Sequence, residues 1–137
     1  MMHSFVLEVD GVRVATLLEV TGLSTETDVI EVKQQGADGT FVVKKLPGRP
    51  KASELTITRG LSEDRTFEQW MADVAHGGAA PRRDVSITVV DYEGQPEVRF
   101  VLAGAWPRRL EYDNFRADAT ESPVERLVLV HEGLERA

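Results

Sequence analysis

The segment Phe5-Val6-Leu7-Glu8-Val9-Asp10-Gly11 sets the fold class of this 137-residue chain. Phe5, Leu7 and Val9 alternate with the residues between them, and a period of two is typical of a strand with one buried face. Asp10-Gly11 follows at once, and Asp-Gly is a preferred two-residue turn of a β-hairpin. The N-terminal sequence therefore predicts a hairpin whose second strand covers 13–20.

The same alternation continues along the rest of the chain. It predicts further strands over 27–34, 41–46, 54–59, 85–90, 98–106 and 124–131. The loop 35–40 contains two glycines and is expected to be mobile, and Pro47-Gly48 is expected to end the strand before it. The polar stretch 108–123 is expected to be irregular.

One segment has a different period. Its apolar residues are spaced i, i+3, i+4 and i+7, which places them on one face of a helix. They are Phe67, Trp70, Met71 and Val74. Ser62 is a suitable N-cap for this helix. The pattern predicts one α-helix at about residues 63–76, with its apolar face packed on the strands.

The order of these elements defines the fold class. Strands follow one another without alternating helices, which excludes a parallel α/β fold. With 42% apolar and 28% charged residues, a chain of this length can bury one core. We therefore predict a mainly β, single-domain protein spanning 1–137, a β-barrel or sandwich of about eight strands with one flanking α-helix.

Composition limits the chemistry that the chain can perform. It has no cysteine, which excludes disulfides and thiolate ligands. It shows no signal peptide and no apolar run long enough for a membrane span, so we expect assembly in the cytoplasm. The net charge of −7 makes nucleic acid a poor default ligand, because phosphates are repelled.

No set of catalytic residues emerges from the sequence. The three histidines share no metal-ligand spacing, and no serine lies in a G-x-S-x-G motif. Glu26, Asp28 and Glu31 cluster near one strand. Paired carboxylates can act as acid and base, but in so acidic a chain a solvated face is the simpler interpretation. We predict no catalytic, cofactor-binding or metal site, and no enzymatic activity.

The segment Lys44-Lys45-Leu46-Pro47-Gly48-Arg49-Pro50-Lys51 is the basic patch of the chain. Three interpretations are open. It is an anion site, or a rigid turn between two strands, or a surface complementary to the acidic remainder of another copy. The third interpretation suggests self-association.

Six short motifs extend almost from end to end. They are Phe5-Val6-Leu7-Glu8-Val9-Asp10-Gly11, Glu19-Val20-Thr21-Gly22-Leu23, Lys45-Leu46-Pro47-Gly48-Arg49, Leu55-Thr56-Ile57-Thr58-Arg59-Gly60, Ala105-Trp106-Pro107 and His131-Glu132-Gly133-Leu134-Glu135. In this order and at this spacing, they resemble the tail-tube proteins of contractile-tailed phages and of phage-tail-like contractile injection systems. Each motif alone is weak, and the set is specific.

The resemblance implies a fold similar to the haemolysin-coregulated protein of type VI secretion, without catalysis or cofactors. It implies that six subunits form a ring and that rings stack into a hollow tube inside a contractile sheath. Such a tube is driven through a target membrane and conducts DNA or protein cargo without binding it specifically. The implied partners are other copies of the chain, the sheath protein, and the baseplate, spike and tube-cap proteins.

Two other functions stay open at this point. One is a tube-initiator paralogue, which joins the tube to the baseplate or spike in a single ring. The other belongs to a different class, a small β-barrel enzyme or ligand carrier, and the apolar inward rows argue against it. The motifs do not distinguish a phage tail from an injection particle or a type VI secretion system.

Stacked rings need two different, complementary surfaces on every chain. If strands 27–34 and 41–46 form one hairpin, its tip and its basic base are candidates for contacts between rings. We predict ring stacking through Gly36, Asp38, Gly39, Lys44, Lys45, Arg49 and Lys51, against an acidic partner surface of Glu26, Asp28 and Glu31.

Overall fold

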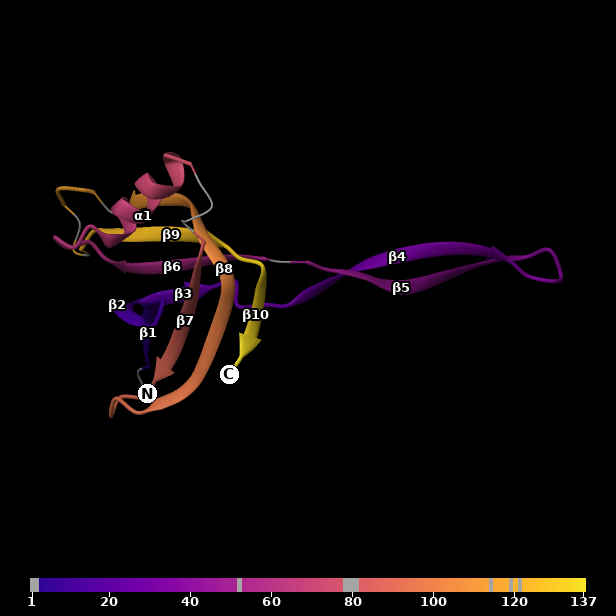
Figure 1. Ribbon diagram of the computed structural model, residues 1–137, viewed down its shortest axis with the longest axis horizontal. Coiled ribbons are helices and arrows are strands. Elements are labelled where there is room, and N and C mark those ends of the chain that lie inside the picture. Colours follow the sequence, from indigo (N-terminus) through magenta and orange to yellow (C-terminus); the bar gives the residue numbers. More distant parts are fainter. Residues whose placement is uncertain (1–2, 52, 78–81, 114, 119, 121) are drawn as a thin grey trace.

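The computed structural model describes residues 3–51, 53–77, 82–113, 115–118, 120 and 122–137. Within them an eight-stranded sheet, one helix and a separate two-stranded ribbon are formed (Figure 1). The elements are β1 (Ser4–Val9), β2 (Val12–Leu17), β3 (Glu19–Thr21), β4 (Glu26–Gln35), β5 (Phe41–Lys51), β6 (Glu54–Gly60), α1 (Thr66–Ala75), β7 (Arg83–Val90), β8 (Pro96–Asp113), β9 (Val124–Val130) and β10 (Gly133–Arg136). The expected mainly β fold with one helix is confirmed.

The large sheet is antiparallel and follows the order β2-β1-β7-β8-β9-β6-β3, with β10 also paired to β8. The 18-residue strand β8 pairs with β7 and β10 along its first part and with β9 along its second. Directly after β2, the amide of Leu18 donates a hydrogen bond of 2.7 Å to the carbonyl of Thr58 on β6. This bond joins the end of β2 to the opposite end of the sheet, so the sheet curls into a barrel.

The inward-facing rows of the barrel form one apolar core. The alternation expected at the N-terminus is confirmed, because Leu7 and Val9 of β1 are buried. The turn between β1 and β2 has positive φ at both Asp10 and Gly11, as a tight hairpin turn requires. The buried apolar residues are Leu7, Val9, Leu17, Leu55, Ile57, Phe67, Trp70, Val85, Ile87, Leu102, Ala105, Leu127 and Leu129.

Helix α1 is fastened to the barrel by a buried arginine of β6. The Nε of Arg59 donates to Glu125 at 2.8 Å, and its Nη1 donates to the carboxylate of Asp64 at 2.9 Å. The same guanidinium lies 3.9 Å above the ring centroid of Phe67. A buried charge of this kind is tolerated because both carboxylates and the ring compensate its desolvation. The start of α1 is thereby fixed against β6 and β9.

The helix starts later than the sequence predicts. It spans Thr66–Ala75 rather than 63–76, and Ser62 is not its N-cap. Asp64 instead accepts bonds from the Thr66 amide at 3.1 Å and the Thr66 hydroxyl at 2.6 Å. Arg59 binds the other oxygen of Asp64, so the segment just before the helix is tied to β6.

The stretch after Pro107 was expected to be irregular, and its first part is a strand. Residues 108–113 continue β8 and pair with β9. Leu110 packs against the core, and the charged residues between find partners, such as Asp113, which accepts from Arg126 at 2.7 Å. The polar composition reflects one solvated face, and the bulge between Pro107 and Arg109 hides the period of two.

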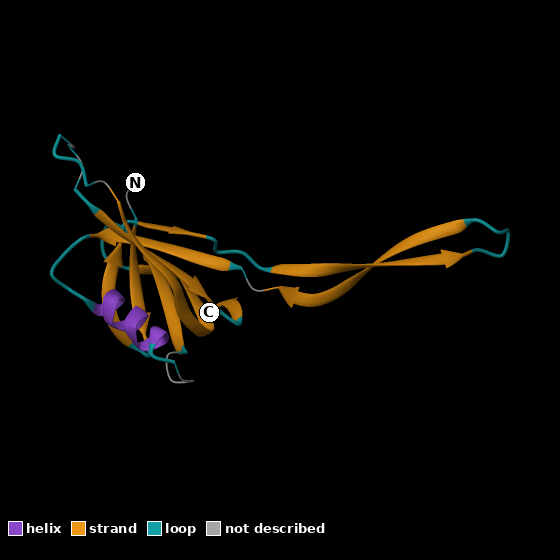
Figure 2. Cartoon of the chain, turned by 90° about the horizontal axis from the view of Figure 1, so that it is seen from above, coloured by secondary structure: helices purple, strands orange, loops and turns teal. Residues whose placement is uncertain are grey.

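The ribbon of β4 and β5 leaves the barrel and extends away from it (Figures 1 and 2). The two strands are paired from Glu26 opposite Lys51 to Gln35 opposite Phe41. Pro47-Gly48 does not end β5 as expected, and the interpretation of 44–51 as a turn is wrong. Each strand of a two-stranded ribbon has one free edge, where a proline without an amide hydrogen is tolerated.

Truncation of Trp70 should destabilise the subunit strongly, because this side chain of α1 is 4% exposed and packs on the core. Trp70→Ala is expected to cost about 3–5 kcal/mol of unfolding free energy. We expect the melting temperature of the dispersed subunit to fall by roughly 10 °C or more. Tyr92→Ala, at a side chain that is 71% exposed, should leave it nearly unchanged. Equal melting curves for both variants would contradict the packing described.

Candidate functional site

The most unusual part of the molecule is the ribbon of residues 26–51, which we call the arm. A ten-residue strand such as β4 is about 34 Å long, so the arm reaches far beyond the barrel. No element of the barrel packs extensively against β4 or β5 among the described residues. Half of the large apolar side chains that the described chain exposes lie on this arm. They are Val29, Ile30, Phe41, Val42, Val43 and Leu46.

The register divides these side chains between two faces of the arm. Residues opposite each other across an antiparallel pair share a face. One face includes Ile30 opposite Leu46, and Val42 opposite Gln34. The other includes Phe41, which is 72% exposed, and Val43 opposite Lys33. Both faces are therefore partly apolar and open to solvent.

The tip of the arm, for which the composition predicts a mobile loop, is a hydrogen-bonded turn. The carboxylate of Asp38 accepts from the Thr40 hydroxyl at 2.7 Å and from the Thr40 amide at 3.1 Å. These bonds hold the pKa of Asp38 below its usual range, and the bond from the Thr40 hydroxyl contributes most. Gly39 adopts a φ of +83°, which favours glycine. The residues predicted at the tip, Gly36, Asp38 and Gly39, thus build the turn itself.

The predicted basic and acidic residues lie together on the arm. Lys45 is opposite Glu31 and Lys51 is opposite Glu26. Lys44 lies beside Lys45 on the other face. Sequence reasoning placed the two sets on complementary surfaces, whereas the structure places them on the two strands of one ribbon. Among the described residues, neither pair forms an ion pair within 4.0 Å.

The two remaining predicted residues lie near the irregularity of the arm. The register shifts between Thr27 and Val29, where Asp28 alone lies opposite Gly48 and Arg49, so the extra residue of this bulge is on β5. A Cβ added at Gly48 would meet the carbonyl oxygen of Asp28 at 3.0 Å, so the strands approach closely here. Arg49 follows Gly48 on β5 and is exposed. The bulge and the glycine therefore shape the base of the arm.

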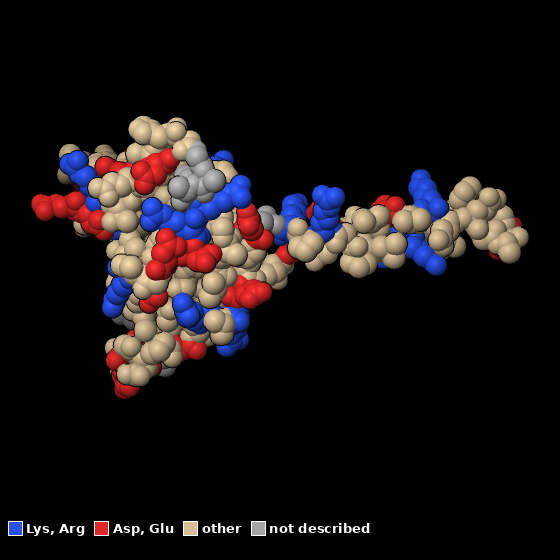
Figure 3. All heavy atoms as spheres, viewed as in Figure 1, with Lys and Arg blue, Asp and Glu red and all other residues tan. Residues whose placement is uncertain are grey.

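Charge is distributed unevenly between arm and barrel. All four lysines of the chain lie in the arm, at 33, 44, 45 and 51. With five basic and four acidic residues the arm has a net charge of +1, and the rest of the chain has −8, for the total of −7. Figure 3 shows the basic side chains spaced along the arm among uncharged ones. Sequence reasoning missed Lys33 and Phe41, although the grouping of the lysines was visible in the sequence.

The root of the arm is held by short polar contacts. The Ser24 hydroxyl donates to Ser53 at 3.1 Å, which joins the segments that enter and leave the arm. Gly22 has a φ of +92°, and a Cβ there would lie 2.2 Å from the carbonyl oxygen of Glu54. Only glycine fits this approach, so backbone contact holds together the segments at the root of the arm.

A buried histidine lies beside this root. His131, between β9 and β10, is 3% exposed, and neither ring nitrogen has a hydrogen-bond partner among the described residues. It lines a cavity of about 130 Å³ with Glu26 and Lys51 of the arm and with Glu132. Burial lowers the pKa of His131, because the charged imidazolium is poorly solvated there.

A decrease in pH should therefore lower the free energy of unfolding of the subunit, because the folded state disfavours protonation of His131. The unfolded chain takes up a proton at about pH 6.5, whereas the folded chain resists it, so stability falls as the pH decreases below that value. His131→Leu should flatten the dependence of the melting temperature on pH between about 7 and 5. His76→Leu, at an exposed position, should keep the wild-type slope. Identical slopes for wild type and His131→Leu would exclude this effect.

The described residues hold neither a metal-binding cluster nor a membrane-spanning helix. No group of three or more histidine, aspartate or glutamate side chains that could hold a metal ion occurs among the described residues. In the same part of the chain, no helix has the length and apolar character needed to span a membrane.

The fold and the arm agree with a family assignment. Residues 2–135 match the family described as T4-like virus tail tube protein gp19, and the chain belongs to this family. The resemblance inferred from the six motifs is thus confirmed. No curated protein sequence matches the chain significantly.

Solved structures share the fold at low sequence identity. A chain from the cryo-EM structure of the anti-feeding prophage tube-terminating cap aligns with a TM-score of 0.80 at 20% identity, covering 97% of this chain and 87% of that one. A chain of the PVC extracellular contractile injection system, in its extended sheath–tube complex, gives 0.80 at 18% identity, with 97% and 87% covered. Hcp1 from Flavobacterium johnsoniae gives 0.56 at 14% identity, with 98% and 94% covered.

Proposed function

We propose that this chain is the main structural subunit of the inner tube of a contractile tail or injection system. Six copies form a ring, rings stack into a hollow tube inside a sheath, and the tube conducts DNA or protein cargo through a target membrane. We propose no catalytic activity for this chain. The proposal therefore sets aside the alternative of a small β-barrel enzyme or ligand carrier. Support comes from the membership in the tail-tube family and, in this molecule, from the exposed arm.

The arm is the observation on which the proposal rests. An isolated two-stranded ribbon is marginally stable in water, and clustered exposed apolar side chains mark interaction surfaces. The arm has both properties, and its own barrel does not cover it. Because the arm of one chain and its receiving surface on another are different, the contact is head to tail and repeats without limit. Repetition of this kind builds a tube.

The edges of the barrel supply a second type of contact. Within the described residues, β2 pairs along its length with β1 alone, and β10 with β8 alone. Each strand thus keeps a row of backbone groups that a neighbour can pair with. We propose that these edges join subunits within a ring. A ring of six agrees with a solved relative from an anti-feeding prophage baseplate, which was symmetrised six-fold.

The proposed partners follow from the same comparisons. The solved relatives come from complexes with sheath, cap and baseplate, and we propose corresponding partners for this chain. Assembly would take place in the cytoplasm, before the tube becomes part of a virion or injection particle. A tube initiator would form single rings without stacking. The size of the assemblies that the purified protein forms therefore distinguishes an initiator from a main tube subunit.

Changes to the arm should abolish stacking and leave the barrel folded. We expect Lys45→Glu with Arg49→Glu, or deletion of residues 36–39, to give a soluble subunit with native circular dichroism but no long tubes in electron micrographs. The reason is that, among the described residues, the arm makes no extensive contact with the barrel, while in the proposed assembly it supplies the surface between rings. Exposed ion pairs contribute only about 0–1 kcal/mol each, but every ring repeats them six times in the proposed assembly.

A matched control reverses two positive charges outside the arm. Arg109→Glu with Arg116→Glu alters two exposed arginines outside the arm and should still allow tubes. Normal tubes from both arm variants, with loss of tubes in the control, would move the stacking surface to the segment 108–123. Single rings from the wild-type chain would favour the initiator.

A further inference from the structure

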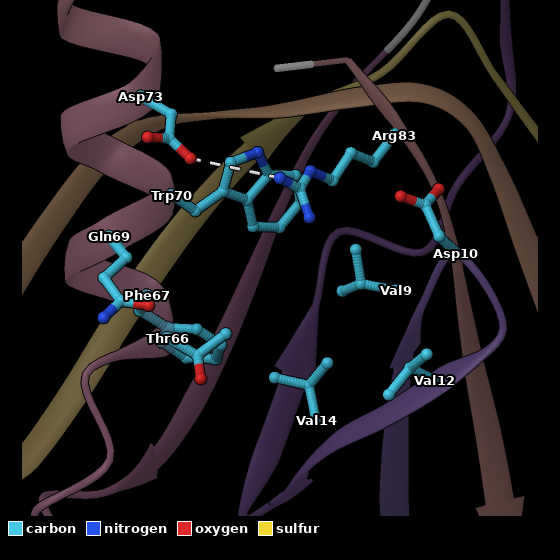
Figure 4. Close-up of a pocket in the computed structure, with 10 residues that line it drawn as sticks. All are labelled: Val9, Asp10, Val12, Val14, Thr66, Phe67, Gln69, Trp70, Asp73 and Arg83. Atoms are coloured by element: carbon cyan, nitrogen blue, oxygen red, sulfur yellow. Dashed lines mark ion pairs between the residues drawn. The ribbon is translucent and has the colours of Figure 1, made fainter. Parts of the chain in front are cut away.

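A cavity lies on the side of the barrel opposite the arm. It opens between helix α1 and the turn that joins β1 to β2, and its volume is about 420 Å³ (Figure 4). Figures 1 and 2 place α1 on one side of the body and the arm on the other. A head-to-tail contact requires its two halves on opposite sides of the chain. This position makes the cavity a candidate to receive the arm of a second copy.

One part of the cavity is apolar. Trp70 of α1 lies on one side, and Val12 and Val14 of β2 lie across from it. Val12 is 66% exposed, although it is a large apolar residue at the edge of a barrel. A cavity of this size is in the range that binds ligands, about 300–1,000 Å³.

The rim of the cavity is charged. Asp10 lies at the β1–β2 turn and Asp73 on α1, whereas Arg83 at the start of β7 lies between them. The Arg83 guanidinium is 3.9 Å from the Asp73 carboxylate and 5.9 Å from the Trp70 ring centroid. The net charge of these three side chains is −1. The cavity thus combines an apolar interior with a slightly acidic rim.

The tip of the arm has the matching composition. Phe41 is the most exposed of the large apolar residues that the described chain presents, and it shares a face with Val43 and Lys33. Lys33 is the diagonal neighbour of Phe41 across the ribbon, roughly 7–8 Å away. An aromatic ring with a cation at this spacing fits an apolar cavity with an acidic rim.

We propose that in the assembled tube this cavity receives the arm tip of a second copy, with Phe41 in its apolar part and Lys33 beside Asp10 and Asp73. The inference rests on the proposed function and adds the receiving site to it. The lysines have a second role, because charges on exposed strand edges prevent arms from pairing with one another. The arm is thereby directed to the cavity of the next subunit.

Disulfide cross-linking tests the contact directly, since the chain has no cysteine. Gln35 is opposite Phe41 on the arm, and Gln69 lines the cavity on α1. Both side chains are exposed, so Gln35→Cys with Gln69→Cys should leave the fold and the proposed contacts intact. After assembly under reducing conditions and mild oxidation with diamide, we expect a ladder of covalent multimers on a non-reducing gel.

The matched control pairs Gln35→Cys with Gln95→Cys. Gln95 lies in the turn after β7, roughly 23 Å along that strand from Arg83, and is also exposed. This variant should assemble equally well and give no ladder. Tubes of the Gln35/Gln69 variant that yield no ladder would overturn the receiving site and leave the proposed function standing. Failure of the wild-type chain to form tubes would overturn the proposed function itself.

A charge exchange tests the same contact without cross-linking. Asp73→Lys should abolish tubes, and Lys33→Asp in the same chain should restore them, because the exchanged pair is again complementary. Asp118→Lys, which changes another exposed carboxylate outside the cavity, should have no effect. Undiminished tubes from a folded Asp73→Lys protein would contradict the proposal.

Discussion

An extended ribbon whose apolar side chains the described part of the barrel leaves exposed is the constraint on which the rest of this structure depends. The backbone of the arm is satisfied internally, because β4 and β5 pair with each other over their length. Its apolar side chains are not buried by the barrel. Desolvation of such side chains is the main driving force of association, so the arm is most stable when a second chain covers it. The proposed head-to-tail assembly rests on this feature.

The barrel provides the rigid base that such an assembly needs. Closure of the sheet through Leu18 and Thr58 and the buried contacts of Arg59 hold sheet and helix as one unit. At the root, the close approach of Gly22 to Glu54 holds together the segments on either side of the arm. The separation of charge, with +1 on the arm and −8 elsewhere, favours contact between the arm of one copy and the body of another.

The sequence predicted the barrel better than the arm, for physical reasons. Alternation with period two located most barrel strands, because these have one buried face, as Leu7 and Val9 show. It missed β10, which has no fully buried residue, and it merged β2 and β3 into one strand. It failed at 108–113, where a bulge interrupts the period, and at Pro47, where a free edge tolerates proline. The hairpin of the predicted stacking site exists. That Lys45 and Glu31 lie opposite each other depends on strand register, which residue types alone do not specify. The cavity between α1 and β2 was not predicted, since it arises from packing of segments distant in sequence.

Amide hydrogen exchange in the dispersed subunit and in the assembled tube tests the central claim most directly. It reports the protection of each strand, and it separates the arm from the barrel within one experiment. Amides of β4 and β5 should exchange rapidly in the dispersed subunit, while those of β7 are protected. On assembly the arm should become as protected as β7. Arm amides that exchange equally fast before and after assembly, while only the barrel edges gain protection, would contradict the account.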